Sequence, residues 1–360
     1  IVVQLLGFAV GLALLWWVVS GVLAPRNREQ LLRLGEAPAW KVAALLALGM
    51  ATTIINGAVF HAAIWPVKRL RTLDIQSVNA AASLLALLPF KLGMIFRIVF
   101  HNRRDGLPLL TIAAWFAAVA ATMLVVALPA VGASLWQIDG VRGGGGLDAR
   151  WWLTAGGGTV VLTAAMIAVA KAMSQAARWA WVERTVRRMP LPSSIKGSGH
   201  GGRAGGTRPG LLPRAHEGLR MLAHGRAVVA CVALRMLDAG VQAARFVLAA
   251  SILGVDLPTS KAVIAGTAYF LIGAVAPTGQ IGAREAGTAG LLGAIMGGVD
   301  MEQFQLVVLL VSASEAGMLL LAGGAGVVWL KLWRGIGKQQ IGIDRERNGA
   351  GTAAVSENGG

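Results

Sequence analysis

The stretch A-P-T-G-Q-I-G-A-R-E-A-G, residues 276–287, interrupts a long apolar run with a proline and glycines, then places Arg284 beside Glu285. A proline removes a backbone donor, and a glycine lets the chain leave helical geometry. Inside hydrocarbon, the freed backbone groups are tolerated only where protein or a water-filled cavity surrounds them. The stretch therefore predicts a broken or re-entrant helix that holds charges in a protected interior.

The composition of the whole chain places this stretch in a membrane. Of the 360 residues, 56% are hydrophobic and 14% are charged, and the mean hydropathy is +0.65. Residues 1–24, 107–138 and 151–170 contain no ionisable side chain. Each is long enough to cross about 30 Å of hydrocarbon, which takes about 20 helical residues. The fold class predicted is all-α, a polytopic transmembrane helical bundle.

Hydropathy and charge together delimit the expected spans. They cover residues 1–24, 42–66, 75–100, 108–134, 151–173, 226–254, 260–299 and 303–330. We interpret 1–24 as a true first span and not as a signal peptide, because it lacks a basic n-region and a small-residue cleavage site.

A polar segment divides the membrane part into two halves of similar size. Residues 190–214 are rich in Gly, Pro, Ser and Arg, which is typical of a flexible linker. We expect a first membrane half at 25–189, a second at 215–335, and a disordered tail at 336–360.

The basic residues that give the chain its net charge of +16 are distributed as expected for a membrane protein. Lys and Arg gather in short segments between spans, as the positive-inside rule predicts, and no base-stacking platform for nucleic acid accompanies them. With the linker and the C-terminal tail placed in the cytoplasm, 25–41 and 101–107 should also be cytoplasmic. Lys68, Arg69 and Arg71 would then lie outside, which conflicts with the rule. Either 75–100 is re-entrant and does not cross, or these residues snorkel into the interface.

The first half contains a counterpart to the opening stretch. In L-L-A-L-L-P-F-K-L-G-M-I-F-R, residues 84–97, a proline again breaks an apolar run, and Lys91 and Arg97 follow it. Interrupted segments at matching positions of two halves indicate a binding site at the interface of an inverted repeat. We therefore predict two inverted halves, each contributing a Pro/Gly-broken or re-entrant segment. Kinks that serve packing alone remain the alternative.

These two breaks predict an anion-attracting centre. A half-helix that starts after each break directs its N-terminal amides into the cavity, and Thr278 is placed to cap the second. Lys91, Arg97 and Arg284 add positive charge. Glu285 would hold Arg284 in place or recognise an amine.

Further charges in apolar runs indicate a polar interior. Arg235, Asp238, Gln242 and Arg245 fall within about 80° of one helical face. Arg235 and Asp238 are either a structural ion pair or substrate contacts, and Glu315 either partners an arginine or carries protons. The expected substrate-binding residues are Pro89, Lys91, Gly93, Arg97, Pro277, Thr278, Gly279, Gly282, Arg284, Glu285, Arg235, Asp238, Arg245 and Glu315.

No catalytic motif is visible in the sequence. It has no H-E-x-x-H, G-x-S-x-G, phosphate-binding Walker loop or metal motif, and its one cysteine excludes an intrachain disulfide. We expect no enzyme activity, no cofactor and no metal.

The two interrupted motifs resemble those of the flippase-like family named for the lysylphosphatidylglycerol synthase transmembrane region. L-L-P-F-K-L-G-M-I-F-R followed by R-R-D-G-L-P-L is similar to the family's first signature, and P-T-G-Q-I-G-A-R-E-A to its second. The resemblance covers roughly 40–335 and carries over Pro89, Lys91, Gly93, Arg97, Pro277, Gly279, Gly282, Arg284 and Glu285.

This chain departs from the family pattern in three places. It has Met94 where an acidic residue is usual, Leu85 where Asn is frequent, and no Glu-Arg pair in 108–134. Substrate or ion coupling is therefore expected to differ. The family's aminoacyl transfer belongs to a separate soluble domain, for which we see no segment in this chain.

The resemblance and the residues together imply a flippase-like protein of the bacterial cytoplasmic (inner) membrane. It would bind and translocate an anionic lipid between leaflets, a membrane phospholipid or a polyprenyl- or hopanoid-type carrier. One alternative is a non-transporting anchor for lipid-synthesis enzymes, and another is a secondary transporter of a small anionic solute with Glu315 as its proton site. No nucleic-acid partner is expected.

Overall fold

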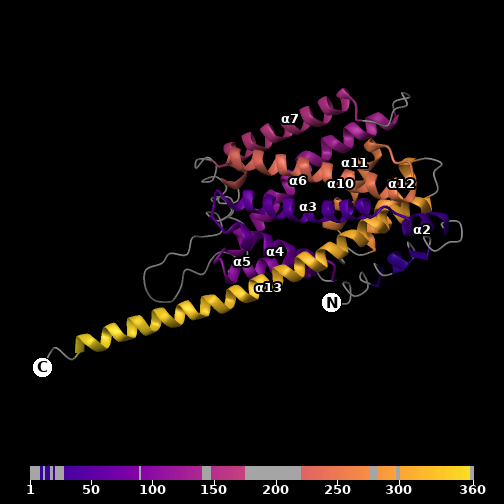
Figure 1. The fold of residues 1–360 in the computed structure, drawn as a ribbon. Coiled ribbons are helices and arrows are strands. Elements are labelled where there is room, and N and C mark those ends of the chain that lie inside the picture. The colour runs from indigo at the N-terminus through magenta and orange to yellow at the C-terminus, as the bar shows by residue number, and fades with distance from the viewer. Residues whose placement is uncertain are drawn as a thin grey trace.

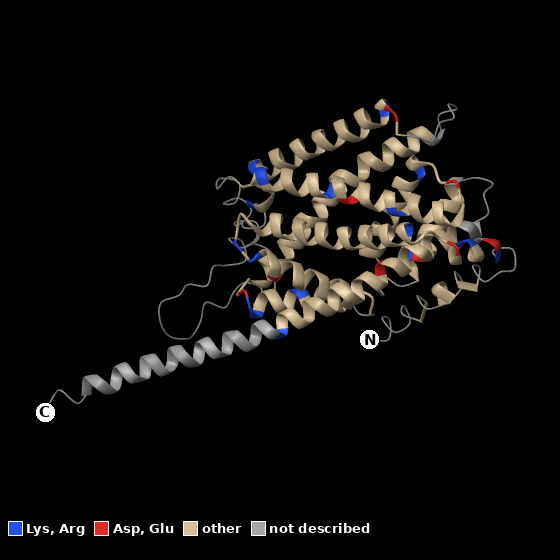
Figure 2. Ribbon diagram, viewed as in Figure 1, with Lys and Arg blue, Asp and Glu red and all other residues tan. Residues whose placement is uncertain are grey.

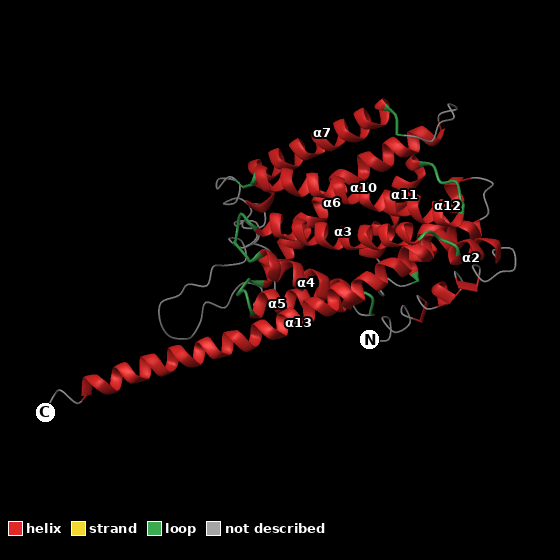
Figure 3. Cartoon of the chain, in the orientation of Figure 1, coloured by secondary structure: helices red, strands yellow, loops and turns green. Residues whose placement is uncertain are grey.

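A computed structural model of the chain describes residues 9–10, 13–16, 19–20, 28–88, 91–139, 147–174, 220–275, 282–296 and 301–356. In these segments every regular element is an α-helix and none is a strand (Figure 3). The predicted all-α bundle is confirmed. The first predicted span, 1–24, and the predicted linker, 190–214, lie wholly or largely outside the described residues.

Five of the described helices are long and apolar enough to cross a membrane. They are α3 (Ala39–Ile64), α6 (Leu109–Asp139), α7 (Ala149–Met173), α10 (Gly225–Leu253) and α13 (Met301–Ser356), the last through its part Phe304–Lys331. Each corresponds to a predicted span. Because these segments carry apolar side chains around most of the helix, they can face both lipid and neighbouring helices.

The segment predicted as a broken span at 75–100 is a helical hairpin. Helix α4 (Thr72–Leu85) has 14 residues and α5 (Leu92–Arg103) has 12, or about 21 and 18 Å at 1.5 Å per residue. Neither crosses hydrocarbon alone. A Cβ atom added at Gly93 would lie 2.1 Å from the carbonyl oxygen of Ala82, so the two backbones touch. Lys91 begins α5 with φ 50°, a left-handed turn at the break.

The second interrupted segment, predicted at 260–299, also has two short helices. They are α11 (Thr259–Val275) and α12 (Ala283–Met296), with 17 and 14 residues. A Cβ at Gly287 would lie 3.0 Å from the side chain of Ile272, so α12 packs back against α11. Pro89, Pro277, Thr278 and Gly279 lie outside the described residues.

The two halves have the same order of elements and opposite orientations. Helix α3, the α4–α5 hairpin and α6 form one set, and α10, the α11–α12 hairpin and α13 form the other (Figure 1). Helix α3 packs along α10, while each hairpin packs against the last helix of the other set, α4 on α13 and α11 on α6. Helix α7 lies on the outside of α6.

Contacts between loops show which segments share an end of the bundle. Lys68 Nζ donates to the Asp105 carbonyl, and Arg104 pairs with Asp74 at 2.8 Å, so the α4–α5 hairpin enters and leaves at one end. Trp329 Nε1 of α13 lies 3.5 Å from Asp74 at that same end. The hairpin therefore does not cross, which is the re-entrant option left open by the sequence.

This topology corrects the expected position of the N-terminal segment. Lys41 Nζ donates to the Ser251 carbonyl at 3.3 Å, and Arg33 lies against Gly254, so 28–41 lies beside the C-terminal end of α10. Lys68, Arg69 and Arg71 lie at the opposite end. The expectation that 25–41 and 101–107 lie on the same side of the membrane is wrong for the described residues. The expected topology counted 75–100 as a crossing span. Because this segment is a hairpin that returns to the same side, only α3 crosses between 25–41 and 101–107, which therefore lie on opposite sides. Figure 2 shows Lys and Arg at both ends of the bundle, with several at the end where the apolar part of α13 stops.

Helix α13 runs to Ser356, and the disordered tail predicted at 336–360 stays a prediction. No proline follows Pro277, so nothing removes a backbone donor from this helix.

Replacing Gly93 by alanine should destabilise the protein by on the order of 1–3 kcal/mol, because the new methyl group displaces the α4 backbone. Gly240→Ala is the matched control. Gly240 is helical with no atom within 4 Å of its added Cβ, so stability should stay equal or rise by up to about 1 kcal/mol. Denaturant titration in detergent measures both, and equal stabilities of the two variants would contradict the close contact.

The hairpin topology predicts that Lys68 and Arg103 face the same side of the membrane, with Asp256 on the other. All three side chains are exposed, and Cys231 is the only cysteine. In a Cys231→Ala background, Lys68→Cys and Arg103→Cys should react with an impermeant maleimide from one side, and Asp256→Cys from the opposite side. Reaction of positions 68 and 103 from opposite sides would show a crossing segment.

Candidate functional site

A cavity of about 460 Å³ lies where the two sets of helices meet. Thr52 and Asn56 line it from the middle of α3, Asp238 from the middle of α10, and Glu315 from the middle of the apolar part of α13. Both hairpins contribute to its wall. Since the contributing helices cross the bilayer, the cavity lies at mid-depth.

Arg97 enters the cavity from α5 and is held by neutral groups. Its Nη2 donates to Asn79 Oδ1 at 2.6 Å, and its guanidinium stacks 4.3 Å from the ring centroid of Phe60. No carboxylate among the described residues pairs with it. Its positive charge is therefore available to an anion in the cavity.

A chain of amides joins Arg97 to an arginine of the other half. Asn56 Nδ2 donates to Asn79 Oδ1 at 3.1 Å, and Asn56 Oδ1 accepts from Arg235 Nη2 at 3.1 Å. Asn79 is fixed in turn by donating to the Thr53 carbonyl at 2.9 Å. Arg235 also pairs with Asp238 at 3.1 Å. Sequence reasoning missed both asparagines, although uncharged amides within apolar runs are a signal for interhelical hydrogen bonds.

Glu315 connects three helices through two arginines. Its Oε1 accepts from Arg284 Nη1 at 3.0 Å, and its Oε2 accepts from both terminal nitrogens of Arg245, at 3.1 and 3.2 Å. Arg245 is completely buried and also donates to the Val311 carbonyl and to Gln242. Of the two roles weighed for Glu315, the structure shows the arginine partner.

Glu285 closes the start of α12. Its Oε2 accepts from the Gly282 amide at 2.6 Å, as the third residue of a capping box does, and its Oε1 accepts from Ser312 Oγ. The same Oε1 lies 3.6 Å from Arg284 Nε. Gly282 has φ 84°, which favours glycine at this turn. This amide, expected to face a ligand, is bound to an internal carboxylate instead.

Arg284 projects from α12 over an aromatic ring. Its guanidinium carbon lies 4.0 Å from the ring centroid of Tyr269, and only 4% of the residue is exposed. The ring and Glu315 together fix its orientation toward the cavity, which it lines.

The structure brings most of the predicted site residues together. Those that line the cavity are Lys91, Gly93, Arg97, Arg235, Asp238, Arg284 and Glu315. Arg245 and Glu285 are buried beside it and hold the lining residues in place. Among the described lining side chains four are cationic and two are anionic, which leaves an excess of two positive charges. Such a cavity favours an anion over a cation.

Replacing Glu315 by glutamine should cost about 3–5 kcal/mol of stability, because two buried guanidiniums lose their carboxylate. Glu29→Gln is the matched control. Glu29 pairs with Arg33, and because the two side chains are 76% and 48% exposed, respectively, the pair should contribute at most about 1 kcal/mol. Unfolding of purified protein in detergent measures the difference. Equal stabilities would mean that Glu315 does not support both arginines.

In a comparison with family models, residues 4–323 match the model described as the lysylphosphatidylglycerol synthase TM region. Comparisons with curated proteins and with solved structures each found no match. The matched region is a membrane domain by its description, in agreement with the five apolar helices. The chain therefore belongs to the lysylphosphatidylglycerol synthase TM region family and is a multi-pass membrane protein whose family connects it with lipid handling.

Proposed function

We propose that the protein is a flippase-like carrier that binds an anionic lipid in the central cavity and moves its headgroup between leaflets. The observation that carries this proposal is a mid-depth cavity with excess positive charge, in which the described partners of Arg97 are an amide and an aromatic ring. Moving a charged headgroup through hydrocarbon costs a large free energy of desolvation. A polar cavity at mid-depth removes most of that free-energy cost.

The lipid phosphate fits between Arg97 and the exposed side chain of Lys91. Both line the cavity, Arg97 from α5 and Lys91 from the residue just before that helix, so the two cations can attract the same headgroup. A planar guanidinium binds phosphate oxygens in pairs, and an ammonium acts as a point charge. Arg235 is the next cation along the amide chain and offers a second position deeper in the cavity.

The rim of the cavity supports a lipid rather than a small solute. Some residues that line the cavity are also exposed at the surface. They are Lys91 just before α5, Met94 on α5, Ala120 on α6 and Ala274 on α11. The neighbouring Ile95 on α5 is 49% exposed and apolar, as expected of a lipid-facing surface. An opening between these helices lets acyl chains remain in the bilayer while the headgroup enters.

We further propose a bacterial cytoplasmic membrane, with the basic end of the bundle in the cytoplasm. Lys68, Arg69, Arg71 and Arg103 lie at that end, and Lys331 of α13 leaves the apolar segment there. The positive-inside rule then places the linker and the C-terminal tail in the cytoplasm.

Replacing Arg97 by glutamine should weaken binding of phosphatidylglycerol by roughly 10- to 100-fold, as expected for loss of a charge-assisted hydrogen bond. Arg104→Gln is the control: Arg104 pairs with Asp74 outside the cavity and should bind as the wild type does. Lipid titration by native mass spectrometry gives the affinities. Translocation of a fluorescent phosphatidylglycerol in proteoliposomes should fall in parallel.

Two results would overturn the proposal. Translocation that proceeds at the wild-type rate with Arg97→Gln would exclude the cavity as the route. Absence of translocation by the wild-type protein, with lipid binding intact, would favour a non-transporting anchor for lipid-synthesis enzymes.

A further inference from the structure

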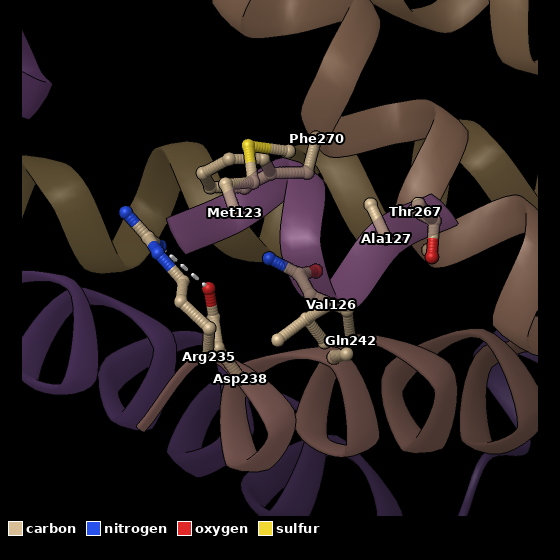
Figure 4. A pocket seen from close by; sticks show the side chains of 10 residues that line it. Met123, Val126, Ala127, Arg235, Asp238, Gln242, Thr267 and Phe270 are labelled. Atoms are coloured by element: carbon tan, nitrogen blue, oxygen red, sulfur yellow. Dashed lines mark hydrogen bonds and ion pairs between the residues drawn. The ribbon is translucent and has the colours of Figure 1, made fainter. Parts of the chain in front are cut away.

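A second, smaller cavity of about 30 Å³ adjoins the central one. It lies between α6, α10 and α11 (Figure 4). Arg235, Asp238 and Gln242 line both cavities, as do the apolar side chains of Met123 and Phe270. The polar residues thus form a wall shared by the two.

Asp238 is the carboxylate of this wall, and one of its oxygens is unused. Oδ2 accepts from Arg235 Nη1 at 3.1 Å, while Oδ1 is buried with no donor among the described residues. The residue is 4% exposed. A buried carboxylate oxygen without a donor is unfavourable, so this atom points to a proton or a water molecule that completes it.

The other buried carboxylates of the site differ in this respect. Both oxygens of Glu315 accept from arginines, and both oxygens of Glu285 accept, one from Ser312 Oγ and one from the Gly282 amide. Asp238 therefore has the free acceptor position that these two lack.

The small cavity can hold water next to that oxygen. A water molecule requires about 10–15 Å³ of such space, so about two fit. Thr267 of α11 and Gln242 of α10 line the same space and supply further polar groups. Figure 4 shows Thr267 on the far side from the Arg235–Asp238 pair.

The charged groups around Asp238 come from several helices. Helix α10 itself carries Arg235, which is in direct contact with Asp238, and Arg245. Glu315 on α13 and Arg284 on α12 form the neighbouring ion pair. Arg97 on α5 is connected to Arg235 by hydrogen bonds through Asn79 and Asn56. Helices α3 and α11 present the neutral Asn56 and Tyr269, and the stretch of α6 beside Asp238 carries no ionisable residue. Glu315 is held by two arginines, which leaves Arg235 as the cation whose movement most directly changes the charge next to Asp238.

We propose that Asp238 binds one proton when Arg235 leaves it for the phosphate of the lipid. This inference rests on the proposed function. A lone pair of Oδ1 forms an O–H bond with a proton from the aqueous phase. Each water of the small cavity that relays the proton accepts one proton and gives up another, and the acid that supplied it is left as its conjugate base. When the lipid leaves, Arg235 returns to Oδ2 and the proton is released. One proton thus accompanies each anionic headgroup, and the charge of the cavity changes little.

Such coupling lets a proton gradient drive the lipid. With one proton per lipid, a difference of one pH unit across the membrane shifts the equilibrium ratio between leaflets about tenfold.

Proton uptake on binding tests the proposal without any transport assay. Calorimetric titration with soluble short-chain phosphatidylglycerol, in buffers of different ionisation enthalpy, gives the number of protons bound per lipid. We expect about one for the wild type and about none for Asp238→Asn, which keeps an acceptor for Arg235. Asp238→Glu should restore the uptake. Asp74→Asn, in the ion pair with Arg104 outside the cavity, should behave as the wild type does.

The outcomes separate this inference from the proposed function. Lipid binding without proton uptake in the wild type, or with undiminished uptake in Asp238→Asn, overturns the role of Asp238 and leaves the anionic-lipid site standing. Absence of lipid binding in the wild type overturns both. If Asp238→Asn fails to fold, the wild-type protein in vesicles decides: a leaflet ratio of fluorescent phosphatidylglycerol that ignores an imposed pH gradient overturns the coupling.

Discussion

Crossing hydrocarbon takes about 20 helical residues, and the backbone groups at a break in a helix need partners inside the protein. Helices α4, α5, α11 and α12 are all shorter than this. The other features follow from that constraint. Each pair must fold back on itself, each must be covered by crossing helices of both sets, and the space between the two pairs lies at the middle of the bilayer. The close contact of Gly93 with the Ala82 carbonyl is where the first fold-back becomes visible in atomic terms.

Polar side chains at this depth connect helices that lie far apart in the sequence. Glu315 joins α10, α12 and α13 through two arginines, and Asn56 and Asn79 join α3, α4, α5 and α10. A buried ion pair contributes little net stability, yet its removal is costly once the partners are buried. These contacts therefore fix which helices meet and leave the driving force to apolar packing around residues such as Phe246 and Trp115.

Much of this was predictable from the sequence, and the reasons for the exceptions are physical. Long charge-free runs predict crossing helices because length and hydropathy decide membrane insertion, and α3, α7 and α10 begin within three residues of the predicted positions. The sequence does not decide whether 75–100 crosses the membrane or folds back, because this apolar run is as long as a crossing span. The contact between Asp74 and Arg104, 30 residues apart, decides it, and no local pattern contains that contact.

For the candidate site too, the sequence predicts some features, while others depend on contacts between distant residues. Charged residues in apolar runs are conspicuous, and Arg97, Arg235, Arg284 and Glu315 all line the cavity. Arg97 and Arg284 belong to the broken-helix motifs, while Arg235 and Glu315 lie in uninterrupted apolar runs. Their partners are set by three-dimensional neighbours, so the bridging role of Asn79 was not visible.

The arginines that follow the two helix breaks are held by different kinds of groups. Arg284 on α12 pairs with the Glu315 carboxylate of α13, whereas Arg97 on α5 donates to the neutral amide of Asn79 on α4. Removing Arg284 from its partner means parting opposite charges in a medium of low polarity, while Arg97 gives up only an uncharged acceptor. In a molecule of nearly mirrored halves, the two arginines are therefore unequal: one is neutralised in place, and the other keeps its charge for a ligand.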